Sequence, residues 1–415
     1  MSQSHTEKKR LRWLGELIPE KGDASRLAVL TLVQSAGTGF FLTSSAIFFT
    51  TVFGFSPTGV GIGLSVAGLC GFLSAVPAGM LADRIGPKKP LLATYTLLSV
   101  FFVLYCFVDD YASFVVVACL ISVCETAGSP LRGALTYVLF GGEKATRVRA
   151  QSRGLFNLGL ALGAATAAPA LAVGGRRAFI VVALVNACAQ LGCAVIGSRL
   201  PATDPARRGS ATASRSALRD GRFVLVTFTS GVLELYQPLL TIGLPLWIVT
   251  HTTVPTALNS VLALTNTVLI VLFQVAVSRG SDTLPGAAAA QRRAGYLLAL
   301  ACPVFALSAY GPTAVSAVTL VAGVVVLCFG ELYQAAGSWG ISFGLPPKER
   351  MGEYQGVFAL GRGVQQFLGP AAVTSLVVGL GVTGWVVLAV VFLSAGLASR
   401  FLVVNPARHP VPQPD

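Results

Sequence analysis

The amino-acid sequence predicts an all-α integral membrane protein with twelve transmembrane helices in two pseudo-symmetric bundles of six. Three observations carry this prediction: the composition, the number of long apolar runs and an internal repeat. Of the 415 residues, 54% are hydrophobic and only 11% are charged, and the mean hydropathy is +0.73. Because a soluble domain carries roughly 25% charged residues, this composition excludes the soluble classes.

The apolar runs predict the helices themselves. A spanning helix needs about 20 apolar residues, and lipid offers no partners to backbone polar groups, so each run is expected to be helical. The runs are continuous and do not alternate, which excludes a β-barrel. Twelve runs lie near residues 27–53, 58–81, 91–108, 111–138, 154–173, 178–198, 223–250, 256–278, 294–310, 313–337, 355–377 and 381–404.

The two halves of the chain resemble each other. Residues 120–164 can be laid over residues 326–370 without a gap, at a shift of 206 positions, which places Glu125 on Glu331 and Gly163 on Gly369. Each copy contains an apolar run, an acid, small residues, a basic turn and a glycine-rich apolar run. In membrane transporters built from such repeats, the substrate site lies at the interface between the repeats.

The basic residues predict the orientation. With both termini in the cytoplasm, they fall in the N-terminal tail, the even-numbered loops and the central linker, and only Arg176 and Arg177 lie in an outside loop. This is the positive-inside pattern of a multi-pass protein of the cell (inner or cytoplasmic) membrane. The net charge of +13 is therefore attributed to topology. We expect the bilayer to be a partner, nucleic acid not to be one, and the chain to be a monomer.

This topology divides the chain into five parts. The long polar stretch between the bundles is rich in Pro, Ser, Ala and Arg, which indicates a flexible or partly helical tether, with a regulatory role as the alternative. No cleavable signal peptide is expected, because the N-terminal segment is polar. The parts are a cytoplasmic tail (1–25), the N-terminal bundle (26–198), the linker (199–222), the C-terminal bundle (223–404) and a second cytoplasmic tail (405–415).

A motif stands between the second and third predicted helices. The segment GMLADRIGPKKPLL, residues 79–92, resembles the signature of the major facilitator superfamily, G-x-L-x-D-R-x-G-R-K-x-x-L. Pro87 departs from it, because the family usually has a basic residue there. The resemblance implies a transporter in which Asp83 helps to hold the cytoplasmic side closed in the outward-open state. The matching positions are Gly79, Leu81, Asp83, Arg84, Gly86, Lys88 and Leu91.

The motif also has a physical interpretation. Gly79 lets two helices approach closely. Asp83 is expected to accept hydrogen bonds from the backbone N–H groups that begin a neighbouring helix, where the helix dipole favours an anion. Arg84 and Lys88 are expected to bind lipid phosphates or carboxylates. The alternative is that these charges only anchor the loop. The corresponding loop of the second half has lost the spacing, so any gate is expected to be asymmetric.

The ionisable residues inside the apolar runs are the candidates for coupling. An ionised side chain at the bilayer centre costs roughly 2.5–3.5 kcal/mol on insertion scales, so such residues usually face a cavity or a partner. Three acids (Glu125, Glu234 and Glu331) and two bases (Arg132 and Arg362) qualify. We expect the acids to bind the coupled proton.

Glu234 is the strongest of these candidates. It lies near the middle of the seventh run, close to Gln237 and to Pro238, which is expected to kink the helix. Because a low-dielectric surrounding favours the protonated form of a carboxylic acid, Glu234 is expected to load and release protons. It would also attract a cationic substrate. The alternative is a structural hydrogen bond to a neighbouring helix.

The two bases predict charge pairs. Arg132 follows Glu125 by seven residues on the same helical face, and Arg362 of the next helix is a candidate partner for Glu331. Each pair is either a structural lock between helices or a contact that breaks when the acid is protonated or substrate binds. The candidate substrate-binding residues are Gln34, Asn157, Glu234, Tyr236, Gln237, Asn266, Tyr333, Gln334, Arg362 and Gln365.

Small residues in the fifth run have two interpretations. Gly154, Gly159 and Gly163 loosely resemble the glycine-rich motif of antiporters in the superfamily, but small residues also allow tight helix packing, which we favour. The eight cysteines lie within apolar runs and show no metal-ligand spacing with histidine, so we expect neither a disulfide nor a metal site.

Together these features predict a secondary active transporter that is not an enzyme and needs no cofactor. No Walker A sequence is present, which argues against an ATP motor in this chain. The favoured function is proton-coupled efflux, by antiport, of a small amphipathic compound such as a drug or secondary metabolite. Two alternatives stay open. One is uptake or facilitated diffusion of a sugar or organic anion, and the other is a non-transporting sensor or scaffold.

Overall fold

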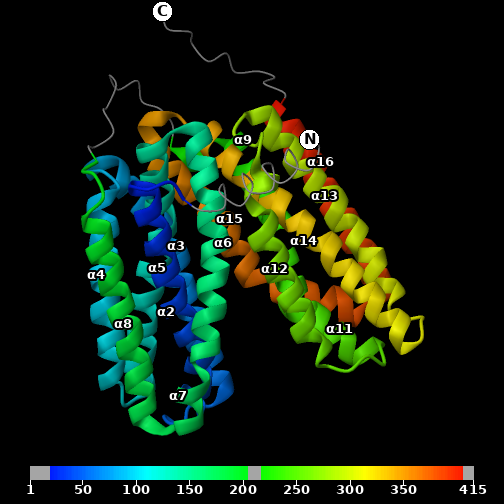
Figure 1. Ribbon diagram of the computed structural model, residues 1–415, viewed down its shortest axis with the longest axis horizontal. Coiled ribbons are helices and arrows are strands. Elements are labelled where there is room, and N and C mark those ends of the chain that lie inside the picture. Colours follow the sequence, from blue (N-terminus) through cyan, green and yellow to red (C-terminus); the bar gives the residue numbers. More distant parts are fainter. Residues whose placement is uncertain (1–18, 204–215, 405–415) are drawn as a thin grey trace, which may run out of the picture. The chain divides into compact units, whose positions relative to one another are not determined.

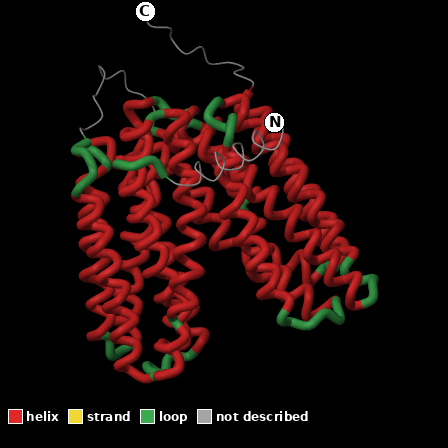
Figure 2. Tube along the Cα trace, viewed as in Figure 1, coloured by secondary structure: helices red, strands yellow, loops and turns green. Residues whose placement is uncertain are grey.

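The computed structural model describes residues 19–203 and 216–404, and it is all-α. Within these ranges every regular element is a helix or a short helical turn, and no strand is formed (Figure 1, Figure 2). The fold class predicted from the apolar runs is therefore confirmed. Most of the two predicted tails, and residues 204–215 of the predicted linker, lie outside the described residues.

Twelve long helical segments follow one another along the described chain. The seventh is built from four pieces, and the third, fifth and eleventh each continue into a short helical piece. The segments are α2 (Asp23–Thr51), α3 (Pro57–Ile85), α4 (Lys88–Leu104) with η1 (Tyr105–Phe107), α5 (Tyr111–Phe140), α6 (Gly142–Thr166) with α7 (Ala168–Val173), α8 (Gly175–Ser198), α9 (Gly221–Leu233) with α10 (Tyr236–Pro238), η3 (Leu239–Gly243) and α11 (Leu244–His251), α12 (Leu258–Ser278), α13 (Leu284–Leu307), α14 (Thr313–Gly344), α15 (Met351–Thr374) with η5 (Ser375–Gly379), and α16 (Val382–Val404).

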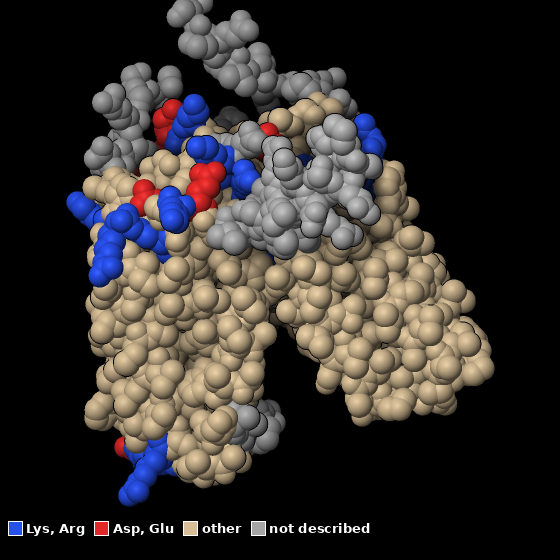
Figure 3. All heavy atoms as spheres, viewed as in Figure 1, with Lys and Arg blue, Asp and Glu red and all other residues tan. Residues whose placement is uncertain are grey.

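Nine of the segments in the described ranges are long and apolar enough to cross a membrane. The other three of the twelve are α6, α13 and α15, and each of them carries at least one arginine. In Figure 3 the charged side chains of the visible face gather at the ends of the helices, and the surface between those ends is uncharged. This distribution is the one that a multi-pass membrane protein requires.

Local sequence signals define where several helices begin. Asp110 accepts a hydrogen bond from Ser113 N at 2.8 Å and so caps the start of α5. Ser56 and Asp220 cap α3 and α9 in the same way. Such caps satisfy the backbone N–H groups of the first turn, which have no partner inside the helix.

The chain divides into two compact units. Unit 1 takes in Met1–Ser214, Ile270–Ala276 and Pro346–Gly363, and unit 2 takes in Arg215–Leu269, Val277–Leu345 and Val364–Asp415. Unit 1 thus includes a segment of α12 and a segment with the first half of α15, both of which belong to the predicted C-terminal bundle. The predicted division of the chain into two bundles joined by a linker at residues 199–222 stays a prediction.

Unit 1 is a bundle in which α2, α3, α4, α5, α6 and α8 run side by side (Figure 1). Aromatic rings fill one part of its core, where Phe49 packs against Phe114 and Phe179. Glycines bring α6 against α2. A Cβ on Gly163 would lie 2.7 Å from Phe40 N, and one on Gly159 would lie 2.7 Å from Leu32 O. This close approach agrees with the packing interpretation of the glycine-rich segment.

Unit 2 contains α13, α14 and α16 packed side by side, with α9 against α16 (Figure 1). Its core is built on large rings, because Trp247 and Trp385 are both fully buried and Phe305 packs against Trp385. The indole N–H of Trp247 donates to Ser308 Oγ at 3.0 Å, which satisfies the one polar atom of that side chain.

Candidate functional site

Glu234 lies at a break in the seventh helical segment. The α-helix α9 ends at Leu233, Glu234 is its C-cap, and after α10 the chain forms a π-helical turn, η3. Pro238 explains the break, because a proline ring clashes with the carbonyl of the residue four positions earlier, which here is Glu234. That carbonyl instead accepts a hydrogen bond from Gln237 N at 2.9 Å. The kink expected from Pro238 is therefore present, and π-turns of this kind often occur at functional sites.

The Glu234 carboxylate belongs to a buried polar network in unit 2. Its side chain is only 7% exposed. Gln334 Nε2 lies 3.5 Å from Glu234 Oε1 and 3.0 Å from Ser338 Oγ. Gln291 Nε2 in turn donates to Ser338 Oγ at 2.9 Å and to Ser230 Oγ at 3.3 Å. We call these five residues, from α9, α13 and α14 and the C-cap of α9, the Glu234 network.

Glu331 lies one helical turn before Gln334 on α14 and is only 4% exposed. Its carboxylate oxygen Oε2 accepts a hydrogen bond from Asn266 Nδ2 of α12 at 3.1 Å. Because residues three positions apart share a face of a helix, Glu331 and Gln334 point in similar directions. Unit 2 thus places two buried acids on or beside the same face of α14.

Glu234 and Glu331 each accept a hydrogen bond from a side-chain amide, and this chemistry matters for protonation. An amide NH₂ group donates, and an oxygen of a carboxyl group accepts whether that group is ionised or neutral. A carboxyl group held in this way keeps its hydrogen bond when it gains or loses a proton.

The charged candidates of unit 1 have a different surrounding. Arg132 donates from one terminal nitrogen to Gln34 Oε1 at 2.5 Å and to the Tyr95 hydroxyl at 3.1 Å. Gln34, predicted as a substrate-binding residue, is thus engaged by Arg132. Glu125 lies two turns earlier on α5 and is half-buried. The hydrogen bonds of Arg132 go to neutral groups, so its predicted charge pair with Glu125 stays a prediction.

Asp83 of the signature-like motif lies in the last turn of α3 and contacts the start of α15, within unit 1. Its two carboxylate oxygens accept hydrogen bonds from Gly352 N at 2.7 Å and from Glu353 N at 2.8 Å. Gly79 and Gly352 lie in direct contact, and a Cβ on either residue would overlap the other's backbone carbonyl. These contacts are of the kind expected for Asp83 and Gly79 from the sequence. The gating role of Asp83 stays a prediction.

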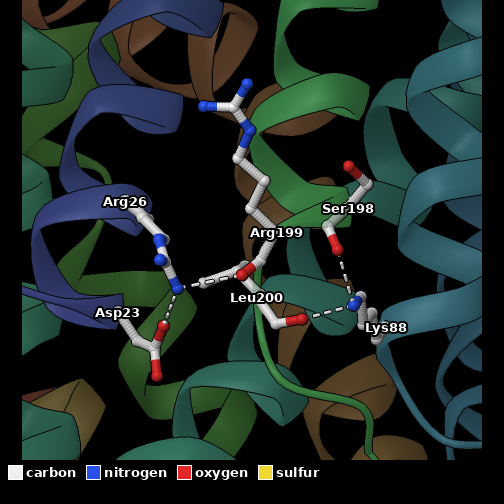
Figure 4. Close-up of polar contacts among 6 residues, drawn as sticks. All are labelled: Asp23, Arg26, Lys88, Ser198, Arg199 and Leu200. Atoms are coloured by element: carbon white, nitrogen blue, oxygen red, sulfur yellow. Dashed lines mark hydrogen bonds and ion pairs between the residues drawn. The ribbon is translucent and has the colours of Figure 1, made fainter.

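Lys88 binds backbone carbonyls rather than a carboxylate. Its ammonium group donates to the carbonyl of Ser198, the last residue of α8, at 2.9 Å and to that of Leu200, two residues further on (Figure 4). In the same view Arg26 donates to Asp23 Oδ1 at 2.8 Å and to Arg199 O at 2.9 Å. A cation at a helix C-terminus is stabilised by the unpaired carbonyls and by the helix dipole. The first residues of the linker are thereby held against unit 1.

The two remaining residues of the gating motif, Gly86 and Arg84, have different surroundings. Gly86 has a φ of +82°, a left-handed conformation that favours glycine, and it lies against the backbone of Thr203. Thr203 Oγ1 also accepts a hydrogen bond from Lys88 N at 3.2 Å. Arg84 is exposed, as a residue that contacts lipid headgroups would be. The left-handed backbone at this position, and the close approach of Thr203, therefore explain why a glycine stands here.

The remaining substrate-binding candidates differ in exposure. Tyr236 and Gln365 are buried, and Asn157 is half-buried. Tyr333 lies under the guanidinium of Arg293, 5.6 Å from the ring centroid. Gln237 and Arg362 are exposed. Their contacts with substrate, and the pairing of Arg362 with Glu331, stay predictions.

Sequence reasoning did not identify three members of the Glu234 network. Gln291, Ser230 and Ser338 are buried and hydrogen-bonded to one another or to Gln334. Gln291 lies beside Arg292 and Arg293, before the predicted run at 294–310, so the sequence gave no signal that it is buried. Ser230 and Ser338 gave no such signal, since serines also occur throughout the apolar runs by bonding to their own helix.

Comparisons with known proteins identify the family. The structure resembles the crystal structure of a bacterial homologue of the iron transporter ferroportin in an outward-facing state, with a TM-score of 0.70 and 14% identity over 92% of this chain and 98% of that one. It also resembles the E. coli fucose:proton symporter, with a TM-score of 0.67 and 14% identity over 92% and 98% of the two chains. Among curated proteins, none matches this chain. The sequence pattern of the Major Facilitator Superfamily matches residues 27–370, and the chain belongs to that superfamily of multi-pass membrane transporters.

Proposed function

We propose that this protein is a proton-coupled secondary transporter that exports a small amphipathic organic compound across the cell membrane. The observation that carries the proposal is the position of Glu234, a buried acid at a break in the seventh segment whose contact with Gln334 tolerates both protonation states. Glu331, held by Asn266, is the second candidate for the coupled proton. The fucose:proton symporter supports proton coupling as a use of this fold.

The proposed cycle follows from the chemistry of these acids. A proton enters from outside onto Glu234 or Glu331 and is released inside. Substrate binds to the deprotonated, inward state and leaves when the acid is neutralised. A buried carboxylate attracts a cationic group, and the apolar helices around it suit the rest of an amphipathic molecule. Export by antiport would then use the inward proton gradient, with the chain acting as a monomer and both termini in the cytoplasm.

Transport by purified protein in liposomes tests this proposal. Ethidium serves as an amphipathic cationic probe, and a trapped pH-sensitive dye reports proton movement in the opposite direction. Wild type is expected to move both, and Glu234→Gln is expected to lose the coupled flux, because an amide cannot release a proton at any accessible pH. Glutamine keeps the size of the side chain and an acceptor oxygen for Gln334, so the variant should remain folded, which thermal unfolding checks.

Two controls separate the possible outcomes. Glu20→Gln changes an exposed acid outside the spans and should leave the flux unchanged. Glu331→Gln identifies which acid carries the proton if Glu234→Gln is only partly impaired. Equal coupled flux in wild type and Glu234→Gln would refute the role of Glu234. Absence of any flux with ethidium and other compounds would favour uptake of a different substrate, or a sensor that does not transport.

A further inference from the structure

Four arginines from three helices of unit 1 interact electrostatically. Arg149 of α6 is at the centre of this group, because it experiences the charges of Arg132 on α5, Arg362 on α15 and Arg153 on its own helix. Arg132, Arg149 and Arg153 are half-buried and Arg362 is exposed, so each keeps some accessible surface. We call these four residues the arginine cluster.

The backbone explains how two of the helices contribute to the cluster. Arg149 and Arg153 are four positions apart on α6, so their side chains share one face of that helix. On α5, the side chain of Arg132 lies beside Gly128, because a Cβ on that glycine would be 3.6 Å from Arg132 Nη1. The small residue one turn earlier therefore leaves room for the guanidinium.

The third helix, α15, lies directly against α5 at this level. A Cβ on Gly133, the residue that follows Arg132, would lie 2.7 Å from Gln355 Oε1 of α15. Arg362 follows Gln355 by seven residues and is therefore on the same face of α15. That face carries Arg362 along the side of α15 that meets α5.

Arg149 has no neutralising partner among the residues that the structure describes. No hydrogen bond or ion pair is formed by its guanidinium there, and all the charges that act on it are positive. The acids of this region act elsewhere, since Glu125 interacts with Arg132 and Glu353 pairs with Arg350. Charges in a protein interior are normally paired, and like charges repel one another, so this arrangement requires an explanation.

The chemistry of the arginine cluster selects an oxyanion as its occupant. A guanidinium has five N–H donors and no acceptor, and its planar fork matches two oxygens of a carboxylate or phosphate. A metal cation would be repelled. A neutral hydroxylated compound would leave the repulsion between the arginines in place. A compact anion with two negative charges offers acceptors to several guanidinium groups at once and offsets their repulsion.

The depth of the cluster favours an anion from the aqueous phase over a lipid headgroup. Arg149 lies seven residues after Gly142, the first residue of α6, and Arg132 lies eight residues before Phe140, the last residue of α5. At 1.5 Å per residue, both are roughly 10–12 Å along their helices from those ends. Lipid headgroups would be expected nearer to the helix ends.

We propose that the arginine cluster is a binding site for a small soluble dianion that carries phosphate or carboxylate groups. The site lies in unit 1, whereas Glu234 belongs to unit 2, so it adds a second class of ligand and does not rest on the proposed proton-coupled export. Arg149 is its central residue, and the other three arginines hold the anion from the sides.

Thermal unfolding of the purified full chain tests this site. Inorganic phosphate and succinate are the probes, at low millimolar concentration, against sodium chloride of equal ionic strength. A ligand that binds only the folded state raises the melting temperature. Wild type is expected to respond to at least one probe with a saturating shift beyond that of chloride. No such shift with either probe would overturn the proposal.

A matched pair of variants assigns the response to the arginine cluster. Arg149→Gln should weaken the binding of the probe at least about tenfold, because it removes the central charge and its paired donors. Arg147→Gln is the control, since Arg147 is an exposed arginine of the same helix, and it should respond as wild type does. General effects of phosphate on protein stability are shared by both variants. An equal response in Arg149→Gln and Arg147→Gln would overturn the proposal.

Chemical modification of the wild-type protein gives a second readout if Arg149→Gln does not fold. Phenylglyoxal reacts with accessible guanidinium groups, and mass spectrometry measures its addition at each arginine. The effective probe should slow modification of Arg149 several-fold and leave Arg147 unchanged. Absence of this protection would overturn the proposal. Protection by phosphatidylglycerol in mixed micelles, with none from phosphate or succinate, would overturn the assignment to a soluble ligand.

Discussion

Replacing Asp83 by asparagine tests whether this carboxylate holds the start of α15 on α3. Asp83 accepts hydrogen bonds from Gly352 N at 2.7 Å and from Glu353 N at 2.8 Å. Both N–H groups belong to the first turn of the helix, where no helical carbonyl is available. Asparagine keeps one acceptor, places an NH₂ group opposite the second N–H, and removes the charge that the helix dipole favours.

The free energy lost in Asp83→Asn follows from the lost hydrogen bond and the lost charge. A hydrogen bond to a charged acceptor contributes about 1.5–3 kcal/mol, and an anion at a helix N-terminus contributes about 0.3–2 kcal/mol. Their sum is roughly 2–5 kcal/mol, and because Asp83 is only half-buried the lower end applies. At 1.4 kcal/mol per factor of ten, 2 kcal/mol corresponds to opening of this turn about 30 times more often.

Hydrogen–deuterium exchange read by mass spectrometry measures this opening directly. The amides of Gly352 and Glu353 are themselves the reporters, so a peptide that covers the start of α15 should exchange faster in Asp83→Asn. Asp220→Asn is the matched control, because Asp220 caps its own helix through Phe223 N at 3.0 Å. That variant should loosen only the start of α9. Unchanged exchange at Gly352 and Glu353 in Asp83→Asn would refute the reasoning.

Three further predictions concern packing and helix geometry. Pro238→Ala should let the Glu234 carbonyl regain a regular helical bond, raising the melting temperature while slowing transport; wild-type flux would show that the break is not needed. Lys88→Met should lower stability by about 1–3 kcal/mol, measured by thermal unfolding, with recovery in Lys88→Arg. Gly79→Ala should speed amide exchange at Gly352, because its Cβ would overlap that carbonyl; normal exchange would contradict the close contact.

The fold was largely predictable because the membrane constrains each segment separately. A continuous apolar run in lipid must satisfy its own backbone groups, so the run predicts a helix without knowledge of its neighbours. The break near Pro238 was predictable for the same reason, since a proline acts on its own helix. The grouping of the first half of α15 with unit 1 was not, because it depends on Gly79 and Gly352 meeting across 273 positions of sequence.

The candidate site was predictable only in part. Glu234 and Glu331 were found because an acid inside an apolar run is costly and therefore marks a function or a partner. Their hydrogen-bond partners were not identified as such, because an amide of a helix that is apolar all round gives no sign of which neighbour it faces. Asn186 and Gln190 were passed over for this reason, although the packing of α8 on α2 buries them completely.

The sequence by itself determined the class of the protein, its twelve spans, the repeat that relates Glu125 to Glu331, and the motif around Asp83. Those properties follow from the transfer of each residue into lipid and from local backbone chemistry. Only the tertiary structure decided that Arg132 binds Gln34 and Tyr95, and that Glu234 joins a network with Gln334. These hydrogen bonds depend on the register and rotation of helices that are distant in sequence. Side-chain packing determines that register and rotation, and the composition of the chain does not.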